Sequence, residues 1–304
     1  MKVTLLPDVG PSEGRSVAVG TFDGVHLGHR EVISGADTVL TFDPHPVSVV
    51  APQHTPKLLT TAARKAELIA SLGVAEMVVI PFDAAFAQRS ADEFVEQVLV
   101  GALDARQVSI GENFRFGNKA KGDPRLLQAD GRFATTVHPL LEADGEIVSS
   151  SHIRGLLLAG DVAIADRLLG APFQLCGEVV HGDERGRELG FPTANLIPEE
   201  ELACPGHGVY ACRARVEGAE GPLGGEGVAA AVSIGVRPTF QTGRGELIEA
   251  YLLDFEGDLY GQPLCLEFLA RLRGERRFES AEALVEQMHR DVEQTRGLAD
   301  SGPR

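Results

Sequence analysis

The pattern of apolar positions changes character partway along the chain. In the first part, short apolar runs predict strands and helical spacing predicts helices between them. The strands are expected at 17–19, 39–42, 77–80 and 107–110, and the helices at 26–33, 61–72 and 91–99. Strands that alternate with helices are typical of a parallel sheet covered by helices. Ligands bind such sheets at the carboxyl ends of the strands, so we expect functional residues in the loops there.

The second part has longer β-type runs, separated by Gly, Pro and acidic residues. They cover 174–180, 208–216, 228–234, 246–255 and 264–271. This pattern predicts an antiparallel barrel or sandwich. A last helix is predicted with Ser280 as its N-cap, a Glu286–Arg290 pair one turn apart, and a stop at Gly297.

A helical pattern over 153–169 lies between the two parts. Gly170 and Pro172 follow it, and glycine followed by proline stops a helix. We therefore expect a first domain of residues 1–170 and a second domain of residues 171–304.

Composition narrows the class of protein. The chain has 304 residues, of which 43% are hydrophobic and 24% charged, as in ordinary soluble globular proteins. Its 28 basic and 44 acidic side chains give a net charge of −16. Such a field does not attract nucleic acid or anionic lipid, so we expect neither as a partner. An anionic substrate would have to be held locally, by helix N-termini, arginines or a divalent metal.

Cysteine usage and the N-terminal residues bear on the compartment. The cysteines at 176, 204, 212 and 265 show no metal-binding spacing, and we expect all of them to be reduced, buried thiols. The first residues lack the apolar core of a signal peptide, and no apolar run approaches the ~18 residues of a membrane span. We expect a cytoplasmic protein that is a monomer or a weak homo-oligomer.

The most informative segment, GTFDGVHLGH, joins a strand to a helix at residues 20–29. His26 and His29 are three residues apart, which puts both rings on one face, and Gly28 lets a ligand approach the backbone. Free N–H groups and the helix dipole favour phosphate at such a helix start. The segment predicts a site that binds a triphosphate and stabilises charge on phosphorus. The alternative is a glycine-rich turn with two exposed histidines.

Two further segments could contribute. In VSSSHIR, Ser150, Ser151 and Arg154 stand at a helix start and suit phosphate oxygens, although an ordinary serine N-cap explains them equally well. In TFDPHP, Asp43 and His45 follow a strand end, where two prolines also suit a purely structural turn.

The segment IGENFRFGNKAKG, residues 110–122, is locally basic in an acidic chain. Phe114 and Phe116 flank Arg115 and offer stacking for a flat ring. A surface loop anchored by its aromatic residues is the alternative interpretation.

In the second part, glycines four apart in the polar segment 182–190 suggest a backbone-rich flap. Thr193 and Asn195 follow it and supply oxygen ligands suited to Mg²⁺. No lysine occurs after position 121, which excludes a GxxxxGK[ST] loop from this half. Glu249 interrupts an apolar β run, either as a residue facing water or as a general base facing a cavity.

Taken in order, GTFDGVHLGH, TFDPHP, GENFRFG and VSSSHIR resemble the adenylyltransferase module of bacterial bifunctional riboflavin kinase/FAD synthetases. HGDERGRELGFPTANL, HGVYA, SIGVRPTF and EAYLLDFEGDLYG resemble their riboflavin kinase module, and the resemblance covers roughly residues 15–297. It implies an α/β Rossmann-like nucleotidyltransferase domain followed by a six-stranded antiparallel β-barrel with a C-terminal helix. It also implies two reactions that use ATP and Mg²⁺: phosphorylation of riboflavin to FMN, then transfer of AMP to FMN to give FAD and pyrophosphate.

The same resemblance implies roles for individual residues. His26 and His29 would hold the ATP phosphates and stabilise the transition state, and Glu249 would accept the proton of the ribityl 5′-hydroxyl. Thr193 and Asn195 would bind Mg–ATP. Further ATP or phosphate contacts would fall on Gly20, Phe22, Asp23, Gly28, Ser150, Ser151, Arg154, Gly182, Gly190 and Pro192. Flavin contacts would fall on Asn113, Phe114, Arg115, Asp43 and His45.

The chain departs from the family between His29 and Thr41, where it is shorter by about a helix and a half. Residues 22–37 still suffice for a minimal crossover, so we expect a helix of only about two turns after the histidines. Two alternatives stay open at this point. The chain could adenylylate another mononucleotide and carry a non-catalytic β module, or it could be a flavin-binding regulatory protein with a decayed adenylyl site.

Overall fold

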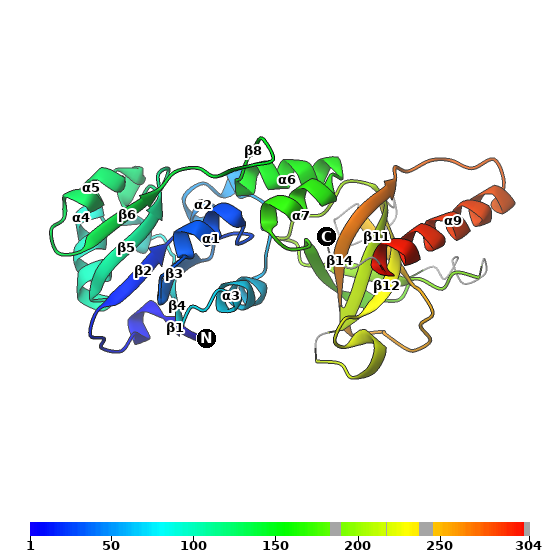
Figure 1. The fold of residues 1–304 in the computed structure, drawn as a ribbon, viewed down its shortest axis with the longest axis horizontal. Helices are drawn as coiled ribbons and strands as arrows, with labels where there is room; N and C mark the ends of the chain where they lie inside the picture. The colour runs from blue at the N-terminus through cyan, green and yellow to red at the C-terminus, as the bar shows by residue number, and fades with distance from the viewer. Residues whose placement is uncertain (183–189, 217, 237–245, 301–304) are drawn as a thin grey trace. The chain divides into compact units, whose positions relative to one another are not determined.

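The structure is a computed structural model, and it describes residues 1–182, 190–216, 218–236 and 246–300. Their contacts divide the chain into two compact units, Met1–His152 and Ile153–Arg304 (Figure 1). The boundary between the units lies just before residues 153–169, the helical segment that the sequence analysis assigned to the first domain.

The first unit is built on a six-stranded, entirely parallel sheet with the order β1-β4-β3-β2-β5-β6. The strands are β1 (Lys2–Leu5), β2 (Arg15–Val19), β3 (Thr38–Asp43), β4 (Glu76–Pro81), β5 (Ala105–Gly111) and β6 (Ala134–His138). The Rossmann-like prediction is confirmed, and all four predicted strands are present. The edge strands β1 and β6 were not predicted, because a strand with one neighbour needs fewer apolar residues.

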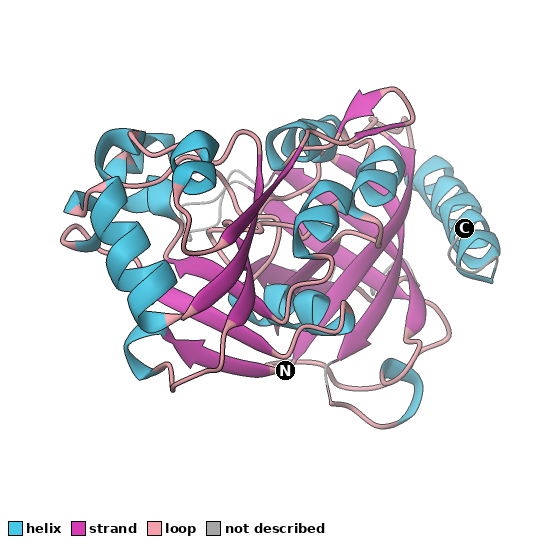
Figure 2. Cartoon of the chain, turned by 60° about the vertical axis from the view of Figure 1, so that its left-hand side comes forward, coloured by secondary structure: helices cyan, strands magenta, loops and turns pink. Residues whose placement is uncertain are grey.

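Helices cover both faces of this sheet (Figure 2). They are α1 (Leu27–Ile33), α2 (Pro46–Val50), α3 (Ala62–Ser71), α4 (Ala91–Glu93) and α5 (Pro124–Ala129), and α4 continues as a π-helical segment, η4 (Phe94–Ala102). A small hairpin of β7 (Glu142–Ala143) and β8 (Glu146–Ile147) follows the sheet. The helix after the histidines has seven residues, which confirms the prediction of about two turns.

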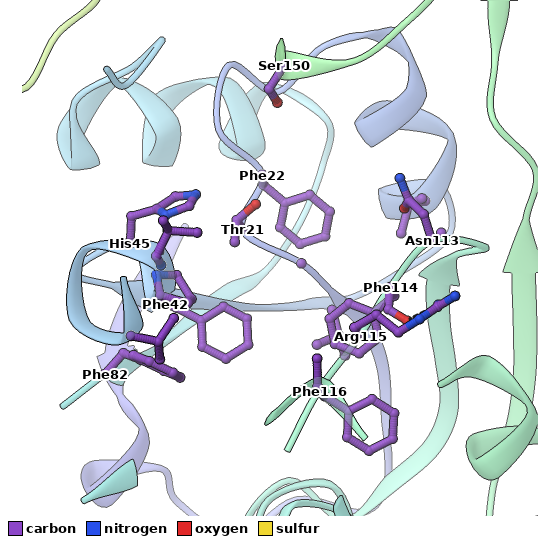
Figure 3. A pocket seen from close by; sticks show the side chains of 18 of the residues that line it. Thr21, Phe22, Phe42, His45, Phe82, Asn113, Phe114, Arg115, Phe116 and Ser150 are labelled. Atoms are coloured by element: carbon purple, nitrogen blue, oxygen red, sulfur yellow. Dashed lines mark hydrogen bonds between the residues drawn. The ribbon is translucent and has the colours of Figure 1, made fainter. Parts of the chain in front are cut away.

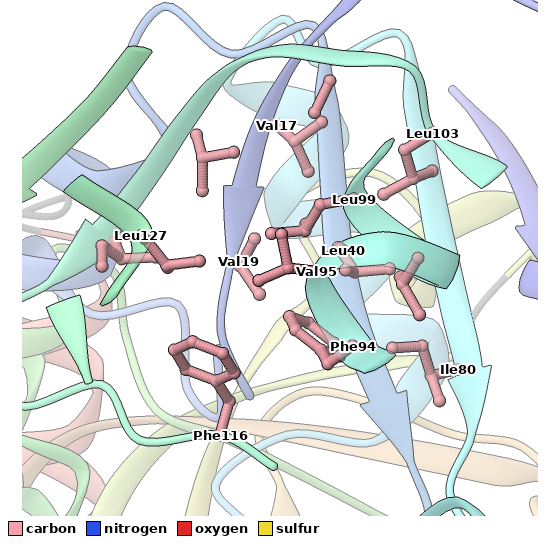
Figure 4. Packing of buried hydrophobic residues seen from close by; sticks show 14 of the residues in the cluster. Val17, Val19, Leu40, Ile80, Phe94, Val95, Leu99, Leu103, Phe116 and Leu127 are labelled. Atoms are coloured by element: carbon pink, nitrogen blue, oxygen red, sulfur yellow. The ribbon is translucent and has the colours of Figure 1, made fainter. Parts of the chain in front are cut away.

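The alternation of side chains along each strand builds two separate cores. Val17 and Val19 of β2 face one side, where Phe94, Leu99 and their neighbours pack against them (Figure 4). Ala18, between them in sequence, belongs to the opposite core with residues of α1 and α3. Because all three β2 residues are buried, burial on both faces explains why this strand reads as a continuous apolar run.

The segment predicted as one helix over 153–169 is two helices, α6 (Ser150–Ala159) and α7 (Val162–Leu169). Gly160 separates them with a φ of +84°, and a side chain at this position would collide with Arg271. Gly170 caps α7 in the left-handed conformation, which confirms the predicted stop.

The second unit is a closed, antiparallel, six-stranded barrel with the order β10-β13-β12-β11-β14-β9, as predicted. Its strands are β9 (Gln174–Val180), β10 (Ala194–Pro198), β11 (Gly208–Val216), β12 (Val228–Val236), β13 (Glu246–Leu252) and β14 (Pro263–Arg273). The strand β10 was not predicted, and β13 ends before the expected Phe255.

The last helix, α9 (Ala281–Asp300), follows the predicted N-cap, since the Ser280 hydroxyl accepts a hydrogen bond from the Ala283 N–H at 3.2 Å. Glu286 and Arg290 pair as expected. The predicted stop at Gly297 is wrong, because the helix continues to Asp300. Arg213 donates to the Ala299 carbonyl at 2.8 Å, which ties the last turn of the helix to the barrel although glycine costs ~1 kcal/mol inside a helix.

The cysteine prediction is wrong for two of the four residues. Cys176 of β9 and Cys265 of β14 are partners in the strand register, with Cα atoms 4.0 Å apart, and form a disulfide. Cys204 and Cys212 remain thiols. The pairing depends on the register of two strands that are 89 residues apart in sequence, which no local pattern reveals.

Among the described residues, no helix combines the length and the apolar character that crossing a membrane requires.

Candidate active sites

A cavity of about 950 Å³ lies at the carboxyl ends of β2, β3 and β5 in the first unit. Figure 3 shows Phe42 and Phe82 on one side of it and Asn113 and Arg115 on the other. The predicted site residues that line it are Gly20, Phe22, His26, Gly28, His29, His45, Asn113, Phe114, Arg115, Ser150 and Ser151. Four segments far apart in sequence therefore meet where the parallel sheet was expected to place its ligand.

The two histidines form a stacked pair at the start of α1. His26 is the N-cap, and its Nδ1 accepts a hydrogen bond from the His29 N–H at 3.1 Å. Because Nδ1 is the acceptor, the proton of the neutral His26 ring is on Nε2. The two ring centroids are 3.5 Å apart with an interplanar angle of 14°. Spacing of three residues has thus brought both imidazoles to one place on the cavity wall.

The turn before α1 is held in an uncommon backbone conformation. Phe22 and Val25 have φ values of +49° and +43°, a region that β-branched and aromatic residues rarely adopt. The Phe22 ring meets the His29 ring edge to face at 5.3 Å. A Cβ at Gly20 would lie 3.0 Å from the Phe22 ring, so a larger residue there would press on this ring. Such strain concentrates at functional sites, where the surrounding structure maintains it.

Asp23 does not line the cavity. It is buried, and its Oδ1 accepts hydrogen bonds from the Leu59 N–H at 2.8 Å and the Thr60 N–H at 3.3 Å. Burial lowers the pKa of Lys65, and the negative charges of Asp23 and Asp43 oppose this shift. Through its hydrogen bonds to Leu59 and Thr60, Asp23 ties the loop before α3 to the histidine turn. Its contact with phosphate stays a prediction.

The serine segment caps a helix and also lines the cavity. Ser149 is the helix cap, since its hydroxyl accepts a hydrogen bond from the His152 N–H at 3.2 Å. Ser150 and Ser151 line the cavity, and the Ser150 hydroxyl donates to the Asp23 carbonyl at 2.9 Å. Arg154 follows on α6 and is not among the described residues that line the cavity.

Aromatic rings dominate the far end of the cavity. Phe114 and Phe116 stack at 5.5 Å, and Phe42 meets Phe82 edge to face at 5.8 Å. Arg115 donates to the Phe114 carbonyl at 2.7 Å, so its guanidinium is held by its own loop.

On the other side, His45 caps α2 by accepting from the Val47 N–H at 3.2 Å. Asp43 ends β3 and does not line the cavity.

Among the lining residues that the sequence analysis did not name as site candidates are Phe82, Arg89 and Lys119. Lys119 lies in the basic segment after β5, which was a usable signal. Arg89 stands 4.6 Å above the Phe86 ring, in a loop without any recognisable motif.

A second cluster of polar residues lies in the barrel. Asn195 of β10 and Glu249 of β13 are partners in the strand register, and Glu249 is also opposite Ser233 of β12. Glu249 is half-buried. Asn195 is only 7% exposed, and its Oδ1 has no hydrogen-bond partner among the described residues.

Such a buried oxygen needs an explanation, and a hard cation provides one. Asn195 Oδ1 and the Thr193 hydroxyl are the ligand type that Mg²⁺ prefers. The described residues contain no cluster of three or more His, Cys, Asp or Glu that could hold a metal. An ion here would therefore keep water or substrate phosphate as further ligands, as Mg²⁺ commonly does. A Cβ at Gly182 would be 2.2 Å from Asn195 Nδ2, so this backbone lies directly against the amide.

Phe191 fixes the turn that carries these oxygens. It is buried and meets Tyr251 of β13 at 5.2 Å and His289 of α9 at 5.1 Å, both edge to face. Gly190 and Pro192 flank it and are exposed. The sequence analysis missed Tyr251 and His289. Residues 183–189 of the predicted flap and 237–240 of SIGVRPTF lie outside the described residues.

Comparison with known proteins agrees with the two units. Residues 10–152 match the family model for FAD synthetase, and residues 169–299 match that for riboflavin kinase. A bifunctional riboflavin kinase/FMN adenylyltransferase of Listeria monocytogenes is 39% identical, with 93% of this chain and 91% of the relative covered. A protein of the same name from Bacillus subtilis is 36% identical, with 91% and 90% covered.

A crystal structure described as a macrolide-efflux protein from Streptococcus pneumoniae superposes with a TM-score of 0.85 and 30% identity, covering 97% of this chain and 99% of that one. Both family models and the full-length relatives agree on a single assignment. The chain belongs to the family of bifunctional riboflavin kinase/FMN adenylyltransferases.

Proposed function

We propose that this chain phosphorylates riboflavin to FMN and then transfers AMP from ATP to FMN, giving FAD and pyrophosphate. The relatives named for both activities and the two matching family models support this. The observation that carries the proposal is the presence of two separate polar groups. One is the stacked His26–His29 pair in the cavity, and the other is the Asn195–Glu249 pair in the barrel. We assign adenylyl transfer to residues 1–170 and phosphorylation to residues 171–304.

In adenylyl transfer, a phosphate oxygen of FMN attacks the α-phosphorus of ATP, and pyrophosphate leaves. Negative charge builds on the phosphorus oxygens during this step. The His26 Nε2–H, the His29 ring and the free N–H groups at the start of α1 are donors for that charge. Ser150 and Ser151 add hydroxyl donors on the same wall, and Phe114 and Phe82 offer faces for the flavin ring.

In the kinase reaction, the ribityl 5′-hydroxyl oxygen attacks the γ-phosphorus of ATP, and ADP leaves. Glu249 accepts the hydroxyl proton as the new P–O bond forms. Thr193 and Asn195 would hold Mg²⁺, which neutralises phosphate charge when bound. The protein contributes mainly position and electrostatics, and it needs no lysine in the barrel for this.

The enzyme's substrates are small molecules, with no nucleic acid or membrane partner. We propose a cytoplasmic enzyme that is a monomer or a weak homo-oligomer.

The test separates the two reactions within one chain. Glu249→Gln removes the base while keeping the size of the side chain. We expect riboflavin phosphorylation to fall by about 10²- to 10⁴-fold, the range of general-base catalysis. FAD formation from added FMN should survive. Glu220→Gln, at an exposed loop position, is the matched control and should leave both activities intact. Chromatography of incubations with ATP, Mg²⁺ and either riboflavin or FMN measures each product.

Loss of both activities in folded Glu249→Gln protein would show that the sites are not separate. The wild-type chain distinguishes the alternatives. FAD from FMN without any FMN from riboflavin would mean a non-catalytic barrel. Flavin binding without turnover of either substrate would mean a regulatory protein.

A further inference from the structure

The position of α1 decides where the stacked imidazoles lie. This helix has only seven residues, and His26 is its N-cap. The apolar cluster around it draws on α1, α3 and the strands β2, β3 and β4. Its buried members are Ala18, Phe22, Val25, Val32, Ile33, Val39, Ile69, Val74 and Met77. Within the described chain, none comes from β5 or β6, although α1 also packs on these strands.

A polar contact attaches α1 to β5, a strand that contributes no residue to the apolar cluster. The last carbonyls of a helix have no partner within it, and Val32 carries one of them. The Ser34 N–H donates to the Arg30 and Glu31 carbonyls, and the Ala36 N–H donates to the Ile33 carbonyl. The Val32 carbonyl instead accepts from the hydroxyl of Ser109 at 2.6 Å. Ser109 belongs to β5 and is only 6% exposed. Its neighbours Val108 and Ile110 belong to the core on the opposite face of the sheet.

A second side chain completes this contact. His138 Nε2 lies 3.0 Å from the Ser109 oxygen. A hydroxyl has one hydrogen, and Ser109 uses it on Val32, so the contact with His138 must be an N–H donated by the ring. His138 ends β6, lines the cavity and accepts the Glu112 N–H through its own carbonyl at 2.8 Å. Hydrogen bonds therefore run from the His138 ring through Ser109 to the end of α1.

We propose that Ser109 and His138 are positioning residues for adenylyl transfer, which hold α1 and thereby the His26–His29 pair against the cavity. This rests on the proposed function of that cavity. A helix of two turns has few contacts of its own, so a tilt at its C-terminal end moves its N-terminal end by a similar amount. Misplacement of a catalytic group by about 1 Å costs on the order of 100-fold in rate. The buried hydrogen bond at Val32 thus affects the reaction only through the position of α1 and its histidines.

The test uses two pairs of variants in the full chain. Ser109→Ala and His138→Leu remove the donors, whereas Ser109→Thr keeps the hydroxyl and His138→Gln keeps an N–H. We expect Ser109→Ala to lower kcat for FAD formation by about 10- to 100-fold, with KM for ATP and FMN changed by less than about threefold. His138→Leu should lose less, because Val32 keeps its donor. The conservative variants should recover most of the rate.

Riboflavin phosphorylation in the same chain is the internal control, and it should not change. Amide hydrogen exchange at Arg30 and Ser34 should quicken in Ser109→Ala. Full FAD formation by Ser109→Ala, or equal loss of both activities, would overturn the inference. A wild-type chain that makes no FAD would instead overturn the proposed function. The exchange measurement would still decide whether Ser109 holds α1.

Discussion

Replacing Asp166 with asparagine should remove a pH dependence from the stability of the barrel unit. Asp166 lies on α7, and its Oδ1 accepts a hydrogen bond from the buried Phe173 N–H at 2.7 Å, which ties the helix to the start of β9. Burial raises the pKa of this carboxyl from its ordinary 3.8 to about 8. The Phe173 hydrogen bond opposes the shift, and the charge of Glu267 adds to it. Near neutral pH the folded unit therefore holds a proton that the unfolded chain has released.

The sign and size of the effect follow from linkage. The stability contributed by the raised pKa is fully present below about pH 4 and is lost as the pH rises through about 8. In between, the free energy of unfolding falls by about 1.4 kcal/mol for each pH unit. From pH 5 to pH 7 the loss is thus about 3 kcal/mol, a large share of the stability of an ordinary domain. Asparagine can still accept the Phe173 hydrogen bond but does not titrate, so this part of the slope should vanish in Asp166→Asn.

The chain offers a selective probe for this measurement. It has no tryptophan, and its three tyrosines, at 210, 251 and 260, all lie in the second unit. Tyrosine fluorescence during urea unfolding therefore reports the barrel unit alone. Burial raises the pKa of Tyr210 to about 12, so this ring stays un-ionised across the range. Asp161→Asn, at the exposed position before α7, is the matched control and should follow wild type. A difference between wild type and Asp166→Asn that stays constant from pH 5 to pH 8 would refute the reasoning.

Two further predictions concern the barrel. Gly182→Ala would place a Cβ 2.2 Å from Asn195 Nδ2. We therefore expect riboflavin phosphorylation to fall by at least about tenfold, while FAD formation from FMN is unchanged. Unchanged riboflavin phosphorylation would contradict this packing. Thiol titration of the denatured, unreduced chain should find two thiols, Cys204 and Cys212, whereas four reactive thiols would contradict the disulfide. Reduction of the Cys176–Cys265 disulfide should lower the unfolding free energy of the barrel unit by about 2–4 kcal/mol.

Much of the fold can be predicted from local sequence patterns. The bounds of β9 and β11 coincide with the apolar runs that predicted them, because turn residues interrupt the pattern at both ends. The spacing of His26 and His29 predicted a shared face at a helix start, and their stacked rings follow from that spacing. The short crossover predicted a short helix, and α1 has two turns. In each case neighbours in sequence determine the outcome.

Other features depend on segments that meet only in the folded chain. The strand β10 is short and contains Asn195 and Pro198, and it forms because β9 and β13 pair with it on both sides. The aromatic end of the cavity likewise needs Phe82 and Phe114 from separate loops.

The sequence by itself thus determined the class of each unit, most of its elements and the residue types of both sites, since burial, capping and turn chemistry are local properties of the chain. Only the tertiary structure decided the register that joins Cys176 to Cys265 and sets Asn195 beside Glu249, and the contact of Ser109 with α1. These depend on how strands and helices far apart in sequence align when they pack, and their energies exist only once that packing has formed.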